Sequence, residues 1–341
     1  TGLNNGTSWQ NAYTTLNIAI HNAPCNGSIW VSEGTYYTPG PNPFLIENNV
    51  KIFGGFNGTQ GLASQRDWEL YRTIISANYQ ANGIKTDNAA VIFDFANAPT
   101  NGEVVIDGFT IRGTYTSSPG TAALNNVGLN GELSLTLRNN KFIYHDNQVV
   151  KSQSDLIIRN CLFAHNTAAS FGQFAISDLT GPSSLTVSFC TFFDNDYYNV
   201  IGIQNVDLAN INNSIFWSNS NVNNFDIAGV LNNLTVANNT TSASIMVPTN
   251  TGANVVNTYD IYPDFTDTLN DVFTLTSCSP VIDLGNSDIF ISEFDLAKNA
   301  RISGSLPDLG CYEFDLPTTQ SIIYVNANAT GSNNGNSWAN A

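Results

Sequence analysis

Two aspartates come closest to a catalytic pair in this 341-residue sequence. Asp194 and Asp196 lie in the string FFDNDYYN, and Tyr197 and Tyr198 follow them directly. Glycoside hydrolysis needs two carboxyl groups about 5 to 9.5 Å apart, and exposed tyrosine rings would offer platforms for a sugar. The string therefore gives Asp194 and Asp196 as candidate catalytic residues. Aspartates directly after a strand also build turns by bonding their own backbone, and we prefer that interpretation here.

A polysaccharide lyase would need a basic residue beside a carboxylate cluster that holds calcium. The chain has only 11 lysines and arginines, and they are scattered. His21, His145 and His165 do not have the spacing of a metal triad, and we expect loop histidines near turns to be solvated. The sequence also lacks a Gly-x-Ser-x-Gly elbow and a phosphate-binding glycine loop. We therefore do not predict an enzyme.

The segment TDTLND, from Thr266 to Asp271, offers hard oxygen ligands of the kind that calcium prefers. Asp267 and Asp271 are the candidate ligands. The segment lacks the spacing of an EF-hand, so turn formation is the default interpretation. Calcium is the one cofactor that the sequence suggests.

The composition excludes some partners. Charged residues make up 11% of the chain, the net charge is −16 and the pI is about 4.2. Binding to nucleic acid depends on lysine and arginine, so it is excluded. No apolar run approaches the length of a membrane span. Polarity comes from Asn, Thr, Ser and Gly, which favours turns and stacked ladders over surface helices.

Short strand-like segments recur through the middle of the chain. Each shows the period-two alternation of a strand with one buried face, and their last apolar residues are 21 to 29 residues apart: LRNNKF (137–142), IRNCLF (158–163), VSFCTF (187–192) and INNSIF (211–216). Repeats of this length are typical of solenoids. The pattern predicts a parallel β-helix, in which equivalent residues stack about 4.8 Å apart.

Stacking of these segments predicts two internal ladders. One is aromatic and the other is small or polar: Phe142, Phe163, Phe192 and Phe216, and Asn140, Cys161, Cys190 and Ser214. Cys161 and Cys190 are then buried thiols, with a disulfide between them as the alternative. An asparagine follows three of the strands, at Asn166, Asn195 and Asn219.

The first residues predict a short amphipathic helix. Apolar residues recur at helical intervals from Ser8 to Ile20, with Ser8 as the N-cap and Pro24 marking the exit. Such a helix would cap the open end of the solenoid.

The two ends of the chain share one motif. TGSNNGNSWANA, residues 330–341, repeats TGLNNGTSWQNA, residues 1–12, at an offset of 329. This recurrence predicts a tandem array. We expect one unit over 1–329, with a closing segment at about 272–315 and a junction at about 316–321, and the start of the next unit at 330–341. The expected seam between units involves Ser8, Trp9, Tyr13, Leu16, Ile20 and Trp338.

Several strings resemble a known family. SWQNAYTTLNIAI, IWVSEGTYY, VKIFGGFNGTQ with SQRD, and SPVIDLGNSD with FDLAKNARISGSLPDLGCYEF are similar to β-helix domains of large Bacteroidetes surface proteins. The closing strings resemble the C-terminal pattern of choice-of-anchor Q proteins. The resemblance implies a right-handed parallel β-helix, export to the cell surface, and a role in adhesion or surface structure.

The resemblance also bears on the cysteines. Cys278 and Cys311 both lie in the closing segment, and an extracellular setting would permit a disulfide between them. Cys311 stands where the family usually has alanine, which favours this pairing.

From these observations we expect a structural or adhesive repeat of a giant extracellular protein. About ten coils at about 4.8 Å would give each unit a length of roughly 50 Å. The expected partners are further copies of the same unit, through head-to-tail contacts and lateral contacts between fibres, and surface polysaccharides. The alternative is a β-helix that binds or cleaves a polysaccharide.

Overall fold

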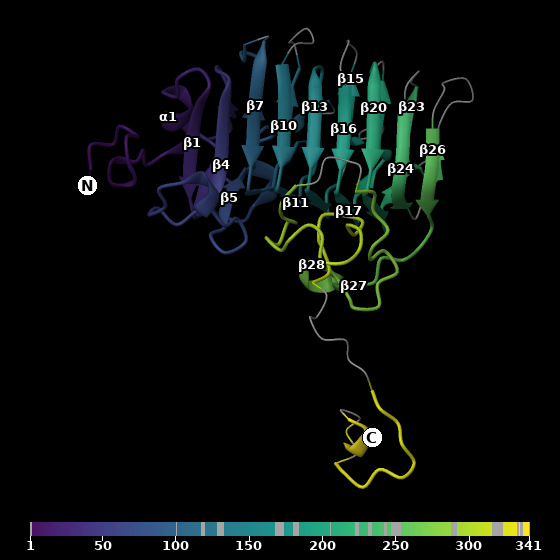
Figure 1. Ribbon diagram of the computed structural model, residues 1–341. Coiled ribbons are helices and arrows are strands. Elements are labelled where there is room, and N and C mark those ends of the chain that lie inside the picture. Colours follow the sequence, from purple (N-terminus) through teal and green to yellow (C-terminus); the bar gives the residue numbers. More distant parts are fainter. Residues whose placement is uncertain are drawn as a thin grey trace.

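Parallel strands wound into coils make up most of the chain (Figure 1). The computed structural model describes residues 2–99, 101–116, 120–127, 133–167, 174–179, 184–204, 206–221, 225–230, 234–241, 244–246, 254–287, 292–315, 323–332, 334 and 337–340. The predicted junction at 316–321 lies outside the described residues.

The strands form three columns that run along the axis of the solenoid. The first column holds β1 (Gly27–Ser32), β4 (Val50–Phe56), β7 (Gly102–Asp107), β10 (Leu133–Arg138), β13 (Asp155–Arg159), β16 (Ser184–Ser188), β20 (Leu208–Asn212), β24 (Leu234–Thr241) and β26 (Asn254–Tyr259). The second holds β2 (Gly34–Tyr37), β5 (Thr73–Ser76), β8 (Phe109–Arg112), β11 (Lys141–Ile143), β14 (Leu162–Ala164), β17 (Thr191–Phe193) and β21 (Ile215–Trp217). The third holds β3 (Phe44–Leu45), β6 (Phe93–Asp94), β9 (Ala122–Asn126), β12 (Gln148–Ser152), β15 (Phe174–Leu179), β19 (Asn199–Gln204), β23 (Phe225–Val230) and β25 (Ser244–Met246).

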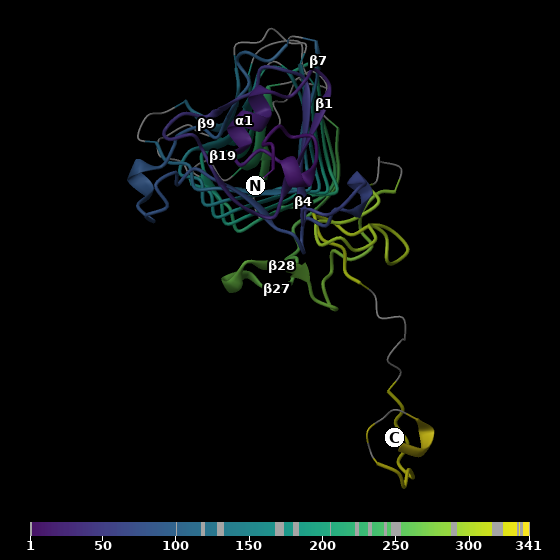
Figure 2. The ribbon, with the colours of Figure 1, turned by 90° about the vertical axis from the view of Figure 1, so that its left-hand side faces the viewer.

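Figure 2 looks along the axis from the N-terminal end of the solenoid. The chain passes clockwise from the first column to the second and third, and each coil lies further from the viewer. The fold is therefore a right-handed parallel β-helix, as expected. Smaller elements lie outside the columns: the parallel pair β18 (Asp196–Tyr197) and β22 (Ser220–Asn221), the antiparallel hairpin β27 (Phe265–Asp267) and β28 (Val272–Leu275), and the 3-10 turns η2 (Ala63–Gln65), η3 (Lys85–Asp87) and η4 (Thr268–Asn270).

Both predicted ladders are present in the core. Ring centroids of successive phenylalanines lie 4.7, 4.7 and 4.6 Å apart along Phe142, Phe163, Phe192 and Phe216. The second ladder is fully buried along Asn140, Cys161, Cys190 and Ser214. Its two cysteines are free thiols, so the buried-thiol interpretation holds and the disulfide alternative does not.

The asparagines that follow the strands form a third, polar ladder. Asn166 Nδ2 donates to Asn195 Oδ1 at 2.9 Å, and Asn195 Nδ2 donates to Asn219 Oδ1 at 2.9 Å. Each side chain also accepts from the backbone N–H one coil earlier: Asn166 Oδ1 accepts from His145 N at 3.0 Å. The ladder therefore satisfies buried corner backbone that would otherwise cost free energy.

His145 begins this ladder, so the expectation of a solvated histidine is wrong. Its side chain is buried. Nε2 lies 3.0 Å from the carbonyl oxygen of Ile111, and Nδ1 lies 2.8 Å from Thr114 Oγ1. A carbonyl oxygen only accepts, so a neutral ring carries its proton on Nε2, and Nδ1 accepts from the backbone N–H of Thr114 at 3.4 Å. Burial lowers the pKa of His145 from 6.5 to about 4.

Acid should therefore destabilise the fold through His145. The unfolded chain binds a proton on this residue below pH 6.5, whereas the folded chain does so only near pH 4, so the free energy of unfolding falls as the pH drops through that window. The His145 contribution is about 3 kcal/mol in full. Denaturant unfolding at pH 7 and pH 4.5 should show a smaller pH-dependent loss for His145→Gln than for the wild-type chain. Equal losses would contradict the assignment.

The N-terminal cap is shorter than predicted. Ser8 caps the 3-10 turn η1 (Trp9–Asn11), with Asn11 N donating to Ser8 Oγ at 3.3 Å, and the α-helix α1 covers only Leu16–His21. Thr14 and Thr15 are β-branched and disfavour a helix, and Thr14 N donates to Asn4 Oδ1 at 3.1 Å. Helix α1 lies against β1 and β3. Among the described residues, no helix is long and apolar enough to cross a membrane.

Candidate functional site

One corner of the β-helix carries a column of polar side chains. Tyr144, His165 and Asp194 directly follow β11, β14 and β17, and their φ angles are 57, 56 and 51°. This left-handed backbone is uncommon for residues other than glycine. The same conformation on successive coils places the side chains above one another. The rings of Tyr144 and His165 stack with centroids 5.4 Å apart.

Asp271, at the turn of the β27–β28 hairpin, completes this cluster. Tyr144 OH donates to Asp271 Oδ2 at 2.7 Å, and His165 Nε2 lies 2.9 Å from Asp271 Oδ1. On the other side of the ring, His165 Nδ1 lies 2.7 Å from Asp194 Oδ2. Burial, together with the bond to Asp271, raises the pKa of Tyr144 to about 12. We call these four residues the corner clamp.

The corner clamp joins the hairpin to the coils. Both nitrogens of His165 face carboxylates, and only a protonated imidazole donates from both nitrogens at once. As a catalytic base, His165 would first have to release one of the two carboxylates. The arrangement therefore suits a hydrogen-bonded fastening of the hairpin to the coils.

The two aspartates of the predicted catalytic pair make different contacts. Asp194 faces His165, and Asp196 is exposed in β18, where its N–H donates to the carbonyl oxygen of Asn166 at 2.8 Å. Tyr197 is 1% exposed and its OH donates to the carbonyl oxygen of Asn147 at 2.6 Å. The expectation that Tyr197 offers a sugar platform is wrong.

The predicted calcium ligands also have other partners. Asp267 Oδ2 accepts from Asn270 Nδ2 at 2.7 Å within the hairpin turn, and Asp271 belongs to the corner clamp. Within the described ranges, no group of three or more His, Cys, Asp or Glu residues could hold a metal ion. The contacts of Asp267 and Asp271 are those of turn formation and fastening.

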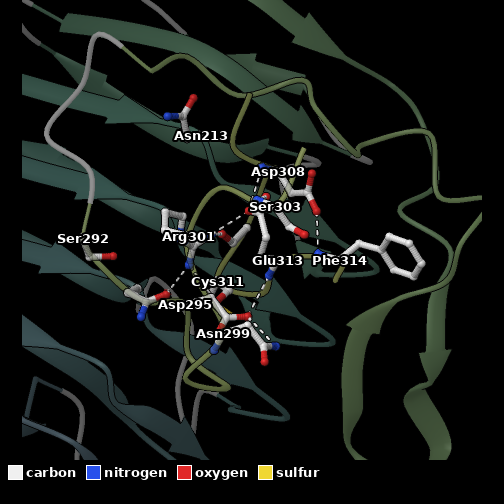
Figure 3. Close-up of polar contacts among 12 residues, drawn as sticks. Asn213, Ser292, Asp295, Asn299, Arg301, Ser303, Asp308, Cys311, Glu313 and Phe314 are labelled. Atoms are coloured by element: carbon white, nitrogen blue, oxygen red, sulfur yellow. Dashed lines mark hydrogen bonds and ion pairs between the residues drawn. The ribbon is translucent and has the colours of Figure 1, made fainter. Parts of the chain in front are cut away.

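A second polar cluster holds the closing segment together, and Figure 3 shows it. Arg301 lies at its centre with 1% of its surface exposed. Its guanidinium donates to Asn160 Oδ1 at 2.5 Å and to the carbonyl oxygens of Gly310 and Cys311 at 3.1 and 3.0 Å. One nitrogen lies 3.9 Å from Glu313 Oε2. Arg301 therefore joins the closing segment to a corner of the coils at Asn160.

The carboxylates of the closing strings accept backbone N–H groups. Asp295 accepts from Asn299 N at 2.7 Å and from Glu313 N at 2.9 Å. Glu313 in turn accepts from the backbone N–H of Ser303 at 3.1 Å and of Asp308 at 3.0 Å. Burial raises the pKa of Glu313 to about 7. These contacts give the motif Asp-x-x-x-Asn-x-Arg, and the strings around it, a structural role.

The closing segment lies along the flank of the coils (Figure 1). Asn213, at a corner of the solenoid, exchanges two hydrogen bonds with the backbone of Asn286, at 3.0 and 2.9 Å. Trp68 Nε1 donates to the carbonyl oxygen of Leu296 at 2.9 Å. The closing segment therefore fastens onto the side of its own unit, and it leaves the strand β26 exposed at the far end.

The predicted disulfide between Cys278 and Cys311 is not formed. Cys278 is exposed, Cys311 is fully buried, and both are free thiols. Burial raises the pKa of Cys311 to about 12, so its thiol is neutral in the packed flank. Cys311 occupies this position as a small apolar residue.

Most of the predicted seam residues at the N-terminus pack against other residues of their own unit. Leu16 and Ile20 are buried in the core of the β-helix. Trp9 lies 5.5 Å from the ring of Phe56, and its Nε1 donates to the carbonyl oxygen of Gln60 at 2.8 Å. Ser8, Trp9 and Tyr13 line a cavity of about 650 Å³ at the open end of the coils.

The described residues of the C-terminal motif make the same contacts as their counterparts in the N-terminal motif. Asn340 N donates to Ser337 Oγ at 3.3 Å, as Asn11 N does to Ser8 Oγ. Ser332 N donates to Asn340 Oδ1 at 3.1 Å, as Leu3 N does to Asn11 Oδ1 at 2.8 Å. Both motifs contain a 3-10 turn, η1 and η5 (Trp338–Asn340). The sequence recurrence is therefore also a structural recurrence.

No protein-family model matches the chain, and no curated protein matches it. Among solved structures, the chain is similar to the crystal structure of pectate lyase Pel9A, with 16% sequence identity and a TM-score of 0.32. The similarity covers 92% of this chain and 94% of that chain. A likeness this distant carries no argument about activity, and the fold rests on the strand pairing described above.

Proposed function

We propose that this chain is a structural or adhesive repeat of a giant extracellular surface protein. Tandem copies would stack head to tail into a stiff rod. The observation that carries this proposal is that residues 331–332 and 337–340 repeat the local contacts of residues 2–3 and 8–11, as the beginning of a second copy would. The Bacteroidetes surface proteins that the sequence resembles supply the expectation of a cell-surface location.

The internal construction suits a mechanical role. Aromatic, small and polar ladders run through successive coils, so each coil is held by its neighbours along the axis. Over the described residues the first column has nine strands, which at about 4.8 Å per coil give a length of about 40 Å. Because the closing segment lies on the flank, neither it nor the corner clamp blocks the far end. Stacking through the two ends is the arrangement that we propose.

Electron microscopy of several tandem copies tests this proposal. Stiff rods with a regular axial repeat of about 40 to 50 Å would support it. A matched sample would carry a flexible Gly-Ser linker in place of residues 316–321 and should lose the regular repeat if the native junction sets the geometry. Separate globules on flexible tethers in the native array would overturn the stiff-rod proposal.

The second candidate function is binding or cleavage of a polysaccharide, and the corner clamp is the observation that favours it. A cluster of two carboxylates, a histidine and a tyrosine on one exposed corner contains groups that acid–base chemistry uses. Release of sugar from a polysaccharide panel, abolished by Asp194→Asn, would support it. Glu103→Gln, which alters an exposed ion pair with Lys51, is the control. No release by the wild-type chain would count against cleavage.

A further inference from the structure

The first strand of the solenoid has an open edge. β4 pairs with one edge of β1, and no described strand pairs with the other. The cavity at the open end lies beside this edge, where Ile29, Trp30 and Val31 of β1 meet Trp9 and Leu16. An unpaired edge beside a cavity lined by both apolar and polar side chains is a ready site for an added strand.

The C-terminal part of the chain contains a segment that matches this site. Ile323–Asn326 reads Ile-Tyr-Val-Asn, and Ile29–Ser32 reads Ile-Trp-Val-Ser. Both read apolar, aromatic, β-branched and polar. Ile323 and Val325 are 76 and 82% exposed, although β-branched residues favour a half-buried strand. The segment therefore has the side chains of a first-column strand without a sheet to join.

The position of this segment relative to the motif points to the same site. The ring of Tyr324 lies 4.8 Å from that of Trp338, and Asn326 Nδ2 donates to the carbonyl oxygen of Trp338 at 3.4 Å. Trp338 corresponds to Trp9 in the N-terminal motif. Placing the one motif on the other brings the tyrosine against Trp9, which lines the cavity and lies 6.3 Å from Trp30.

We propose that Ile323–Asn326 of one copy pairs with β1 of the following copy as an added parallel strand. The proposal rests on the tandem array of the proposed function. The register would set Ile323 over Ile29, Tyr324 over Trp30 and Val325 over Val31.

This register continues rows that the structure already contains. Ile29 pairs with Ile52, and Ile52 with Ile106, in the buried row of the first column. Ile323 adds one more member to that row. Trp30 pairs with Phe53. Tyr324 would add a third ring to this aromatic row, on the opposite face of the strands from the isoleucine row. The β-helix of each unit would thus be completed by a strand that the preceding copy supplies.

A binding experiment on the full chain tests the proposal. The receptor carries Ile323→Asp and Val325→Asp, which are exposed positions, so that its own segment does not compete. A labelled synthetic peptide of residues 321–329 should bind it saturably by fluorescence anisotropy. The same peptide with both aspartates should bind at least about 10-fold more weakly, because two buried charges would lack partners.

Crosslinking locates the bound peptide. A benzophenone in place of the Tyr324 ring should give adducts between residues 2 and 51, which contain Trp9 and β1. Val256→Asp, in the exposed strand β26 at the opposite end, should leave binding unchanged. Absence of saturable binding, equal binding of the aspartate peptide, or adducts on 254–259 would overturn the proposal.

The outcomes separate this proposal from the rod. Peptide binding at β1 together with globules on tethers in the microscope would retain strand donation and reject the stiff rod. Regular rods without peptide binding would support the stiff rod and reject the proposal that Ile323–Asn326 pairs with β1.

Discussion

Replacement of Arg301 by methionine should lower the free energy of unfolding of the closing segment by about 3 to 5 kcal/mol, because the buried acceptors Asn160 Oδ1, Gly310 O and Cys311 O would lose their donor. The guanidinium is the cationic partner of Glu313, and it donates to the carbonyl oxygens of Gly310 and Cys311. Methionine fills similar space but donates no hydrogen bond. The carbonyl groups and the Glu313 carboxyl group would stay buried without it.

We expect the closing segment of the Arg301 variant to unfold at a lower urea concentration than the coils. Trp68 donates to Leu296 of the closing segment, so its fluorescence should report the release of that segment at lower urea than the circular dichroism of the coils. Arg301→Lys keeps the charge but not the planar fork of donors, and should fall between methionine and wild type. Arg72→Met, which removes an exposed ion pair with Glu69, should cost less than about 1 kcal/mol. Equal costs at positions 301 and 72 would contradict the central role of Arg301.

Periodicity in the sequence predicts the coils and the ladders because each coil repeats the same local pattern. A buried phenylalanine at one position of successive coils has to meet its equivalents about 4.8 Å away. His145 was missed because its string, YHDN, looks like a solvated turn, whereas in the fold it heads the ladder of Asn166, Asn195 and Asn219. Its alignment with these asparagines, directly after the corner residue, was the available signal.

The corner clamp could not be predicted from periodicity. His165 and Asp271 are 106 positions apart, and they meet only because the closing part of the chain turns back along the flank. The closing strings were recognised through resemblance, but their carboxylates take part in hydrogen bonds that depend on tertiary packing. The predicted disulfide between Cys278 and Cys311 is wrong for the same reason, because tertiary packing buries Cys311 and leaves Cys278 exposed.

Truncation of Phe192 to alanine should cost about 3 to 5 kcal/mol, because it removes buried apolar surface and leaves a cavity in the core. Its ring lies between those of Phe163 and Phe216, with centroids 4.7 and 4.6 Å away. In a solenoid each coil is stabilised mainly by its two neighbours, so this one cavity weakens two interfaces. Phe192→Leu keeps most of the volume and should cost about 1 to 1.5 kcal/mol. Urea unfolding of both variants measures the difference.

A double-mutant cycle separates the ladder from general hydrophobic burial. Phe163→Ala and Phe192→Ala remove the same ring contact, so their combined cost should depart from the sum of the single costs by about 0.5 to 3 kcal/mol. Phe44 is also buried, but its ring lies 5.5 Å from that of Phe93 in another column. Phe44→Ala should therefore add to Phe192→Ala within about 0.5 kcal/mol. Additivity in both cycles would mean that the rings act as separate apolar side chains. Coupling confined to the first would show that the stack transmits stability from coil to coil, as a stiff rod requires.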